Sequence, residues 1–287
     1  MSTKRAGRRL EYWSGGVLEC WVFTPSFQYS SPPDYEGEFV ESELINQSSH
    51  RPWPLPSKPW IVAMRWHDLL FLHWPVQPEV IRPLIPRGLE IDTFDDSAWI
   101  GVVPFRMTGV RPRYLPRFAG LAFPEMNVRT YVWSPGRSGV WFFSLDAANR
   151  LAVRAARAWY GLPYYDARMN VQLQGGTVHY DSRRIDKKST GAEFHASYKP
   201  TGEVYRSAPG TLDRWLTDRY CLYAVDRRGR LGYAEIHHAP WPLQGSEVEL
   251  RVNSMTSPLG IKLPDTPPRA HFARRLDVIA WPVESLA

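Results

Sequence analysis

The 287-residue chain has few of the residues and patterns on which several protein classes depend. Its two cysteines, Cys20 and Cys221, lie far apart and match no metal or redox spacing. No apolar run reaches the roughly 18 residues of a membrane span. The best candidate for a secretory signal, residues 15–23, is interrupted by Glu19. These absences predict a reduced, cytoplasmic protein that does not span a membrane.

Patterns for nucleotide chemistry and serine-hydrolase chemistry are absent as well. There is no G-x-G-x-x-G or Walker-type loop and no G-x-S-x-G elbow. The net charge of +6 comes from arginines scattered among hydrophobic segments, whereas a nucleic-acid face usually shows a basic cluster. Lysine is scarce, with six residues at positions 4, 58, 187, 188, 199 and 262. A nucleic-acid partner is therefore not expected.

Proline and aromatic residues are abundant, with 26 Pro, 13 Trp, 14 Tyr and 12 Phe. An interior proline removes a backbone donor and clashes with the preceding helical turn, so this density argues against a helical bundle. From residue 61 onward, short strand-like segments recur between turn residues, as in a β-barrel or a β-sandwich. The sequence predicts an α+β, β-rich fold with few helices.

The first 57 residues differ in composition from the rest. They contain Ser-Ser-Pro-Pro at 30–33, an acidic stretch, and a proline-rich segment at 51–56. We expect residues 1–57 to form a poorly ordered N-terminal extension. Residues 58–287 are then the folded domain.

The clearest local elements are a helix and a hairpin. The helix has one apolar face and is stopped by Gly161 and Pro163; the face consists of Leu151, Ala155, Ala158 and Trp159. Residues 123–133 and 140–145 read as the two strands of a hairpin. A shorter helix is predicted at 212–217, with Thr211 as its N-cap.

The histidines give no metal pattern. His67 and His73 lie on one face of a predicted strand, but about 20 Å apart at 3.3 Å per residue, which is too far for one shared metal ion. His237 and His238 are adjacent, so at most one of them faces a cavity. We keep His238 as a candidate for ligand binding.

Between Trp66 and Trp281, a series of segments occurs in the same order as in a known protein family. They are residues 68–75, 86–92, 99–105, 125–131, 139–146, 161–165, 219–223 and 238–243. Together they resemble the YqjF-like family, a bacterial domain of unknown function. That family is in turn distantly similar to acetoacetate decarboxylase, which implies a closed, cone-shaped β-barrel with a few peripheral helices.

The resemblance implies the decarboxylase fold without the decarboxylase nucleophile. In the decarboxylases an Arg-Glu-x-x-Gly/Ala-x-Pro-Lys-Lys run ends in a lysine pair, one of which forms a Schiff base. Here the run begins at Arg157, and Tyr164 and Tyr165 occupy the lysine positions. A phenol cannot condense with a ketone to give an iminium, so this chemistry is not expected.

The resemblance also implies a site inside the barrel. Glu125 matches the acidic residue of the decarboxylase pocket, and Arg157 matches the arginine of the motif. Arg129 lies on the same predicted strand face as Glu125, and Tyr164 or Tyr165 can donate to a ligand oxygen. The expected partner is a small molecule, with no cofactor, no metal, no nucleic acid and no membrane, and a homo-oligomer is left open.

Three functions remain open at this point. The chain binds a small apolar carbonyl or carboxylate compound, or it is an enzyme that uses Tyr and Glu as acid and base on a keto acid or enol, or it is an interaction protein that acts through its N-terminal extension. A structural alternative also stands, in which Glu125 and one arginine form a buried pair that only closes the barrel.

Overall fold

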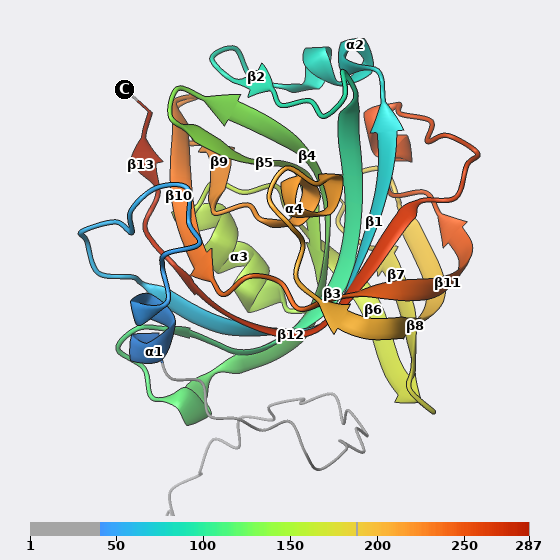
Figure 1. Ribbon diagram of the computed structural model, residues 1–287, viewed down its shortest axis with the longest axis horizontal. Helices are drawn as coiled ribbons and strands as arrows, with labels where there is room; N and C mark the ends of the chain where they lie inside the picture. The colour runs from blue at the N-terminus through green and yellow to red at the C-terminus, as the bar shows by residue number, and fades with distance from the viewer. Residues whose placement is uncertain (1–40, 188, 287) are drawn as a thin grey trace, which may run out of the picture. The chain divides into compact units, whose positions relative to one another are not determined.

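The computed structural model describes residues 41–187 and 189–286, all within the compact unit formed by residues 36–287. These residues form one sheet of thirteen strands with a few short helices (Figure 1). The strands are β1 (Val62–Val76), β2 (Glu90–Ile91), β3 (Ala98–Pro112), β4 (Leu121–Ser134), β5 (Arg137–Ala147), β6 (Tyr164–Gln174), β7 (Thr177–Arg184), β8 (Glu193–Tyr205), β9 (Cys221–Val225), β10 (Leu231–His238), β11 (Leu243–Asn253), β12 (Arg269–Ala280) and β13 (Glu284–Ser285). The helices are α1 (Glu41–Asn46), α2 (Pro78–Ile81), α3 (Arg150–Trp159) and α4 (Leu212–Thr217), with 3₁₀ turns η1 (Arg82–Leu84), η2 (Arg117–Ala119) and η3 (Ser257–Leu259).

The strand pairing runs in the order β13-β10-β9-β5-β6-β7-β8-β11-β12-β1-β3-β4-β2, with two further pairs, β10–β12 and β5–β4. Because of these two pairs, the pairing can be followed from β12 through β1, β3, β4, β5, β9 and β10 back to β12. Most pairs are antiparallel, and β5 pairs in parallel with β6 and β9. The expected β-rich fold with few helices is thus confirmed.

Several local predictions are confirmed. β4 and β5 form the expected hairpin. α3 ends before Gly161, whose φ of 65° suits a residue without a side chain. The Thr211 side chain caps α4 by accepting from the Arg214 backbone N–H. The period-two pattern of residues 89–94 predicts a strand there, but only Glu90 and Ile91 pair, as β2, and a turn follows them.

β1, β3 and β4 are buried on both faces. One face of each strand packs against β6, β7, β8 and β12 in the largest apolar cluster, which includes Leu70, Leu72, Val102, Val128, Tyr180, Phe194 and Phe272. The residues that alternate with these along β1, β3 and β4 point to the opposite side of the sheet. There they line a cavity together with residues of β5, β9 and β10. The adjacent strands β1, β3 and β4 therefore separate a close-packed apolar core from a cavity.

An irregularity in β1 sets which of its residues reach the cavity. Asp68 has a φ of 51°, and the register with β3 shifts between His67 and Leu72. A bulge of this kind changes the parity of the side chains along a strand. As a result, both Trp66 before the bulge and Leu69 after it line the cavity.

Residues 41–57 pack against β10. The guanidinium of Arg51 is buried and donates to Glu235 Oε2 at 2.6 Å and to the carbonyl of Ile236. The indole of Trp53 donates to the same carboxylate oxygen at 2.8 Å. The remainder of the expected extension, residues 1–40, lies outside the described residues. No helix in the described ranges is long and apolar enough to cross a membrane.

Candidate functional site

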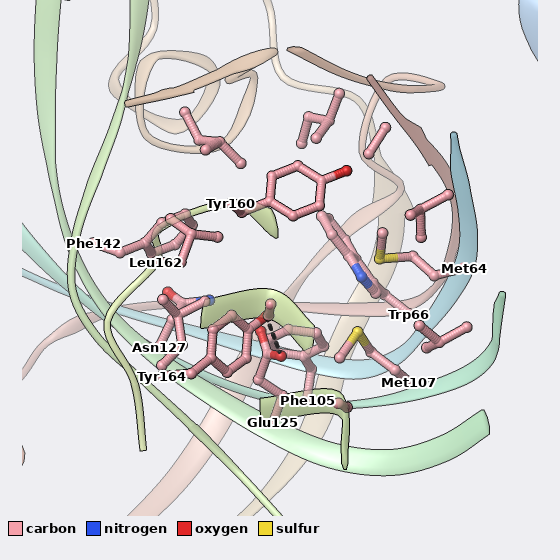
Figure 2. A pocket seen from close by; sticks show the side chains of 18 of the residues that line it. Met64, Trp66, Phe105, Met107, Glu125, Asn127, Phe142, Tyr160, Leu162 and Tyr164 are labelled. Carbon is pink, nitrogen blue, oxygen red and sulfur yellow. Dashed lines mark hydrogen bonds between the residues drawn. The ribbon is translucent and has the colours of Figure 1, made fainter. Parts of the chain in front are cut away.

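The central feature of the folded unit is a cavity of about 390 Å³ between the β1–β3–β4 face and strands β5, β9 and β10. Its wall is almost entirely apolar, with side chains that include Met64, Phe71, Val103, Phe105, Met107, Phe142, Leu145, Leu162 and Trp241. Figure 2 shows Met64, Phe105 and Met107 on one side of this space and Phe142 and Leu162 on the other. A cavity lined in this way with a few polar groups is typical of small-molecule sites.

Glu125 and Tyr164 form a polar pair on this apolar wall (Figure 2). The Tyr164 hydroxyl donates to Glu125 Oε2 at 2.8 Å. Burial raises the pKa of Glu125 to about 8, against the opposing effect of the Tyr164 hydrogen bond. Burial also raises the pKa of Tyr164 well above its ordinary value, and the neighbouring carboxyl adds to this shift. The pair is therefore neutral at pH 7, with both groups protonated.

Protonation makes the pair a hydrogen-bond donor to the cavity. Glu125 Oε2 accepts from Tyr164, and the neutral carboxyl has one O–H of its own to donate. A carboxylic acid held neutral at pH 7 can donate a hydrogen bond to a carbonyl oxygen or a proton to a ligand oxygen. The two residues come from β4 and from the first position of β6, and only the tertiary fold brings them together.

Several further polar residues of the cavity were not predicted from the sequence, among them Asn127, Trp66 and Tyr160. Asn127 follows Glu125 by two positions on β4, and its Oδ1 atom is buried without a hydrogen-bond partner among the described residues. In the same part of the chain, the indole nitrogen of Trp66 has no partner either. Tyr160 lies across the cavity from Glu125 in Figure 2, and burial raises the pKa of its phenol. Alternation along β4 could have indicated Asn127, whereas nothing local pointed to Tyr160.

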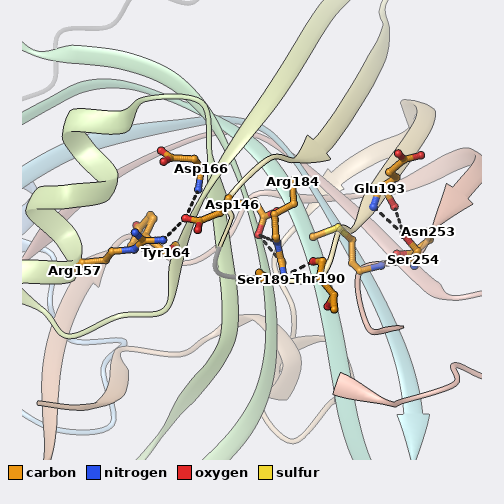
Figure 3. A network of polar contacts seen from close by, with 12 residues as sticks. Asp146, Arg157, Tyr164, Asp166, Arg184, Ser189, Thr190, Glu193, Asn253 and Ser254 are labelled. Carbon is orange, nitrogen blue, oxygen red and sulfur yellow. Dashed lines mark hydrogen bonds and ion pairs between the residues drawn. The ribbon is translucent and has the colours of Figure 1, made fainter. Parts of the chain in front are cut away.

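Tyr165 and Arg157 are placed outside the cavity. The ring of Tyr165 lies against the guanidinium of Arg184 at 4.3 Å. Arg157 donates from Nε to the Tyr164 carbonyl at 2.7 Å and pairs with Asp186 at 2.5 Å (Figure 3). Arg157 thus holds the main chain at the start of β6. The alternation of two consecutive tyrosines gives one inward and one outward side chain, and Tyr164 is the inward one.

Arg129 lies on the cavity wall with Glu125. Its Nη2 atom donates to the carbonyl of Leu216 at 3.2 Å and to the Tyr131 hydroxyl at 3.4 Å. The backbone of β4 therefore presents Glu125, Asn127 and Arg129 to the same space. Of the six candidates from the sequence, the structure brings four together around one cavity, namely Glu125, Arg129, Tyr164 and His238.

His238 is a neutral histidine at the cavity wall. Its Nδ1–H donates to the carbonyl of Ala239 at 2.7 Å, and its ring stacks on Tyr220 at 4.7 Å. Burial lowers the pKa of His238 to about 3. His237 faces the other way and donates to the carbonyl of Leu44, as expected for adjacent strand residues. No group of three or more metal-ligating side chains occurs within residues 41–187 and 189–286.

The mouth of the cavity lies beside α3. Leu151 and Trp159 line the cavity, yet they are 70% and 65% exposed, and Leu121 of β4 is 41% exposed. The apolar face predicted for this helix thus surrounds an opening and does not pack into the core, where Val153 is the buried residue. Among the described residues, no lysine lines the cavity.

Comparison with known proteins identifies relatives of the whole folded unit. A family profile named DUF2071, described as an uncharacterized conserved protein, matches residues 63–277. The chain is 45% identical over 230 residues to "Uncharacterized protein YqjF" of Bacillus subtilis, a match that covers 80% of this chain and 94% of that protein. The predicted resemblance to YqjF-like proteins is therefore confirmed.

Solved structures with a similar fold include an enduracididine biosynthesis enzyme and acetoacetate decarboxylase-like proteins. The enduracididine biosynthesis enzyme MppR, solved with pyruvate, has a TM-score of 0.58 at 12% identity and covers 82% of this chain and 93% of its own. An acetoacetate decarboxylase-like enzyme from Sphingomonas wittichii RW1 has a TM-score of 0.54 at 14% identity, with 80% and 94% covered. At these identities the likeness shows the fold alone.

Proposed function

We propose, on the premise that this chain belongs to the DUF2071 family of uncharacterized conserved proteins, that it binds a small apolar carbonyl or carboxylate compound in the cavity beside Glu125. The observation that carries the proposal is the neutral Glu125–Tyr164 pair in a wall that is mostly apolar. Such a pair donates to a ligand oxygen while the wall takes up the apolar part of the ligand. We further propose that the circuit of paired strands forms the closed, cone-shaped barrel of the decarboxylases.

The size and polarity of the cavity support this proposal. A cavity of about 390 Å³ is within the range of small-molecule sites. A cavity filled by Trp and Phe side chains would have argued for a purely structural role. Glu125 also makes no ion pair with an arginine among the described residues, which argues against a carboxylate that only closes the barrel.

Schiff-base decarboxylation has no support in this site. The positions of the decarboxylase lysine pair hold Tyr164 and Tyr165, and neither phenol can form an iminium with a ketone. The described lysines do not reach the cavity wall. A structural neighbour, MppR, was solved with pyruvate, and that precedent supports testing carbonyl compounds as ligands here without assuming the decarboxylase reaction.

A second candidate is an enzyme that uses Glu125 and Tyr164 as acid and base on a keto acid or enol. The pKa of about 8 for Glu125 favours it, because proton transfer is most efficient when the pKa of the catalytic group lies near the working pH. The test is exchange of α-protons of a ketone for deuterium, followed by NMR. Rates equal to those without protein would overturn this candidate.

The binding proposal is tested by calorimetric titration of octan-2-one, an apolar ketone without charge. We expect saturable binding by the wild-type protein. Tyr164→Phe should weaken it by roughly 5- to 30-fold, since one hydrogen bond of the polar pair is lost. Tyr165→Phe is the matched control, because its ring lies outside the cavity against Arg184. Absence of saturable binding by the wild type for ketones and carboxylates alike would overturn the proposal.

A further inference from the structure

Two buried arginines, Arg129 and Arg219, line the same cavity, and only Arg219 has a carboxylate partner among the described residues. Arg219 Nη1 pairs with Asp92 Oδ2 at 2.5 Å, and its side chain is 4% exposed. Arg129 is 9% exposed, and within the described ranges no carboxylate lies within ion-pair distance of it. The two guanidinium groups and the one carboxylate leave a net charge of +1 in this part of the wall.

The partners of Arg129 satisfy part of its guanidinium without neutralising it. They are a backbone carbonyl at the end of α4, the Tyr131 hydroxyl, and the rings of Phe71 and Tyr131 at 5.4 and 5.6 Å. Within the described ranges, the Nε–H of Arg129 and the Nη2 of Arg219 are buried and have no hydrogen-bond partner. Each arginine therefore keeps one unused donor, and each contributes atoms to the cavity wall.

No neighbouring titratable group supplies the missing negative charge. Burial keeps Glu125 protonated, with a pKa of about 8. Burial lowers the pKa of His73 well below its ordinary value, and Arg129 adds to this effect, so His73 is neutral. Asp218 is paired with Arg214 at 3.2 Å. A buried charge without a counter-ion is strongly unfavourable, and the cost is relieved when an anion binds beside it.

We propose that Arg129 and Arg219 form the binding site for the carboxylate group of an otherwise apolar monocarboxylate. The unused donors of the two guanidinium groups bind the carboxylate oxygens, a pairing that arginine geometry favours. The apolar chain then lies along the wall toward the mouth beside α3. Glu125 and Arg129 are separated by roughly 13 Å along β4, at 3.3 Å per residue, which leaves room for a chain between the two polar ends of the cavity.

This inference rests on the proposed function, and its test separates the two. Octanoate, methyl octanoate and octan-1-ol have the same apolar chain but differ in charge, and their affinities are measured by calorimetry at pH 7. We expect the wild type to bind octanoate about 10- to 100-fold more tightly than either neutral probe. Arg129→Gln should remove this preference while octan-1-ol binding stays close to that of the wild type. Arg183→Gln, an exposed arginine whose side chain is 71% accessible, is the matched control and should keep the preference.

Each outcome decides one of the two proposals. Equal affinity of the wild type for octanoate and the neutral probes would overturn the carboxylate site and leave the apolar cavity in place. If Arg129→Gln still binds octanoate more tightly than the neutral probes, the carboxylate site is likewise overturned and the apolar cavity stays in place. If the wild type binds none of the three probes, both proposals fail. The wild-type preference needs no variant, so the test remains decisive even if Arg129→Gln does not fold, and Arg129→Lys should retain part of the preference because it retains the charge.

Discussion

The hydroxyl of Tyr164 donates to the carboxyl of Glu125 at 2.8 Å across 39 positions of sequence. This contact joins β6 to β4 on the wall of an apolar cavity. The sequence resemblance to the decarboxylases implies an amine at this position, where this chain has a phenol. The phenol is a hydrogen-bond donor, and the acid beside it is neutral at pH 7.

Glu125→Gln should alter how stability depends on pH. In the unfolded chain this carboxyl ionises near its ordinary pKa of 4.5, whereas in the folded protein it stays protonated up to about pH 8. Between these values the unfolded state binds fewer protons, so the group lowers the free energy of unfolding as pH rises, by up to about 1.4 kcal/mol per unit. Gln does not titrate, so the variant should gain stability relative to the wild type over this window.

The measurement is urea unfolding of both proteins at pH 4.5, 6 and 8. Effects of other titrating groups cancel in the difference between the two proteins. Glu247→Gln serves as the control, because that side chain is 67% exposed. If the Glu125→Gln and wild-type stabilities change in parallel with pH, the carboxyl is ionised in the folded protein and its proposed role is wrong.

Tyr164→Phe should raise the pKa of Glu125 further. The hydrogen bond from Tyr164 stabilises the ionised carboxyl and opposes the effect of burial, so its loss leaves burial unopposed. The variant should also lose about 1 to 3 kcal/mol of stability, because a buried acceptor loses its donor. Carbon-13 NMR of the Glu125 carboxyl reports the pKa directly. A carboxyl that titrates at lower pH in the variant would contradict this arrangement.

Asp146→Asn should strongly destabilise the fold. Asp146 of β5 accepts from both Nε and Nη2 of Arg184 on β7, and the two side chains are 0% and 2% exposed (Figure 3). Removing the negative charge leaves a buried guanidinium unpaired, which typically costs about 3 to 5 kcal/mol. Urea unfolding measures the loss. As the control, Arg183→Gln breaks the neighbouring exposed pair with Glu193 and should change stability by less than about 0.5 kcal/mol. Equal losses of stability in the two variants would mean that burial does not make the Asp146–Arg184 pair more important than an exposed pair.

Ala155→Trp should slow the access of ligands to the cavity. Ala155 is exposed and lines the cavity next to Leu151 and Trp159, so a larger side chain there narrows the mouth. Because the position is exposed, stability should change little. Stopped-flow measurement of octan-2-one binding should show a several-fold lower association rate. Arg154→Trp, one position earlier and outside the cavity lining, should bind at the wild-type rate; a lower rate in both would place the mouth elsewhere.

The sequence by itself determined the features that depend on local chemistry. Period-two patterns and turn residues gave the β4–β5 hairpin, and Gly161 with Pro163 fixed the end of α3. Ordered matches identified the YqjF-like family, and the tyrosines at the lysine positions argued against Schiff-base chemistry. The role of residues 1–57 and the use of the cavity were expectations that these patterns alone could not test.

Only the tertiary structure decided which side chains share the cavity. The bulge at Asp68 changes the parity of β1, and a rule of simple alternation cannot foresee it. Long-range strand pairing selected Tyr164 over Tyr165 and brought Arg219, 90 positions after Arg129, to the same wall. The apolar face of α3 has the pattern of a core helix, yet it surrounds an opening. Local periodicity reports that a face is apolar, whereas what lies against that face depends on how distant strands pair.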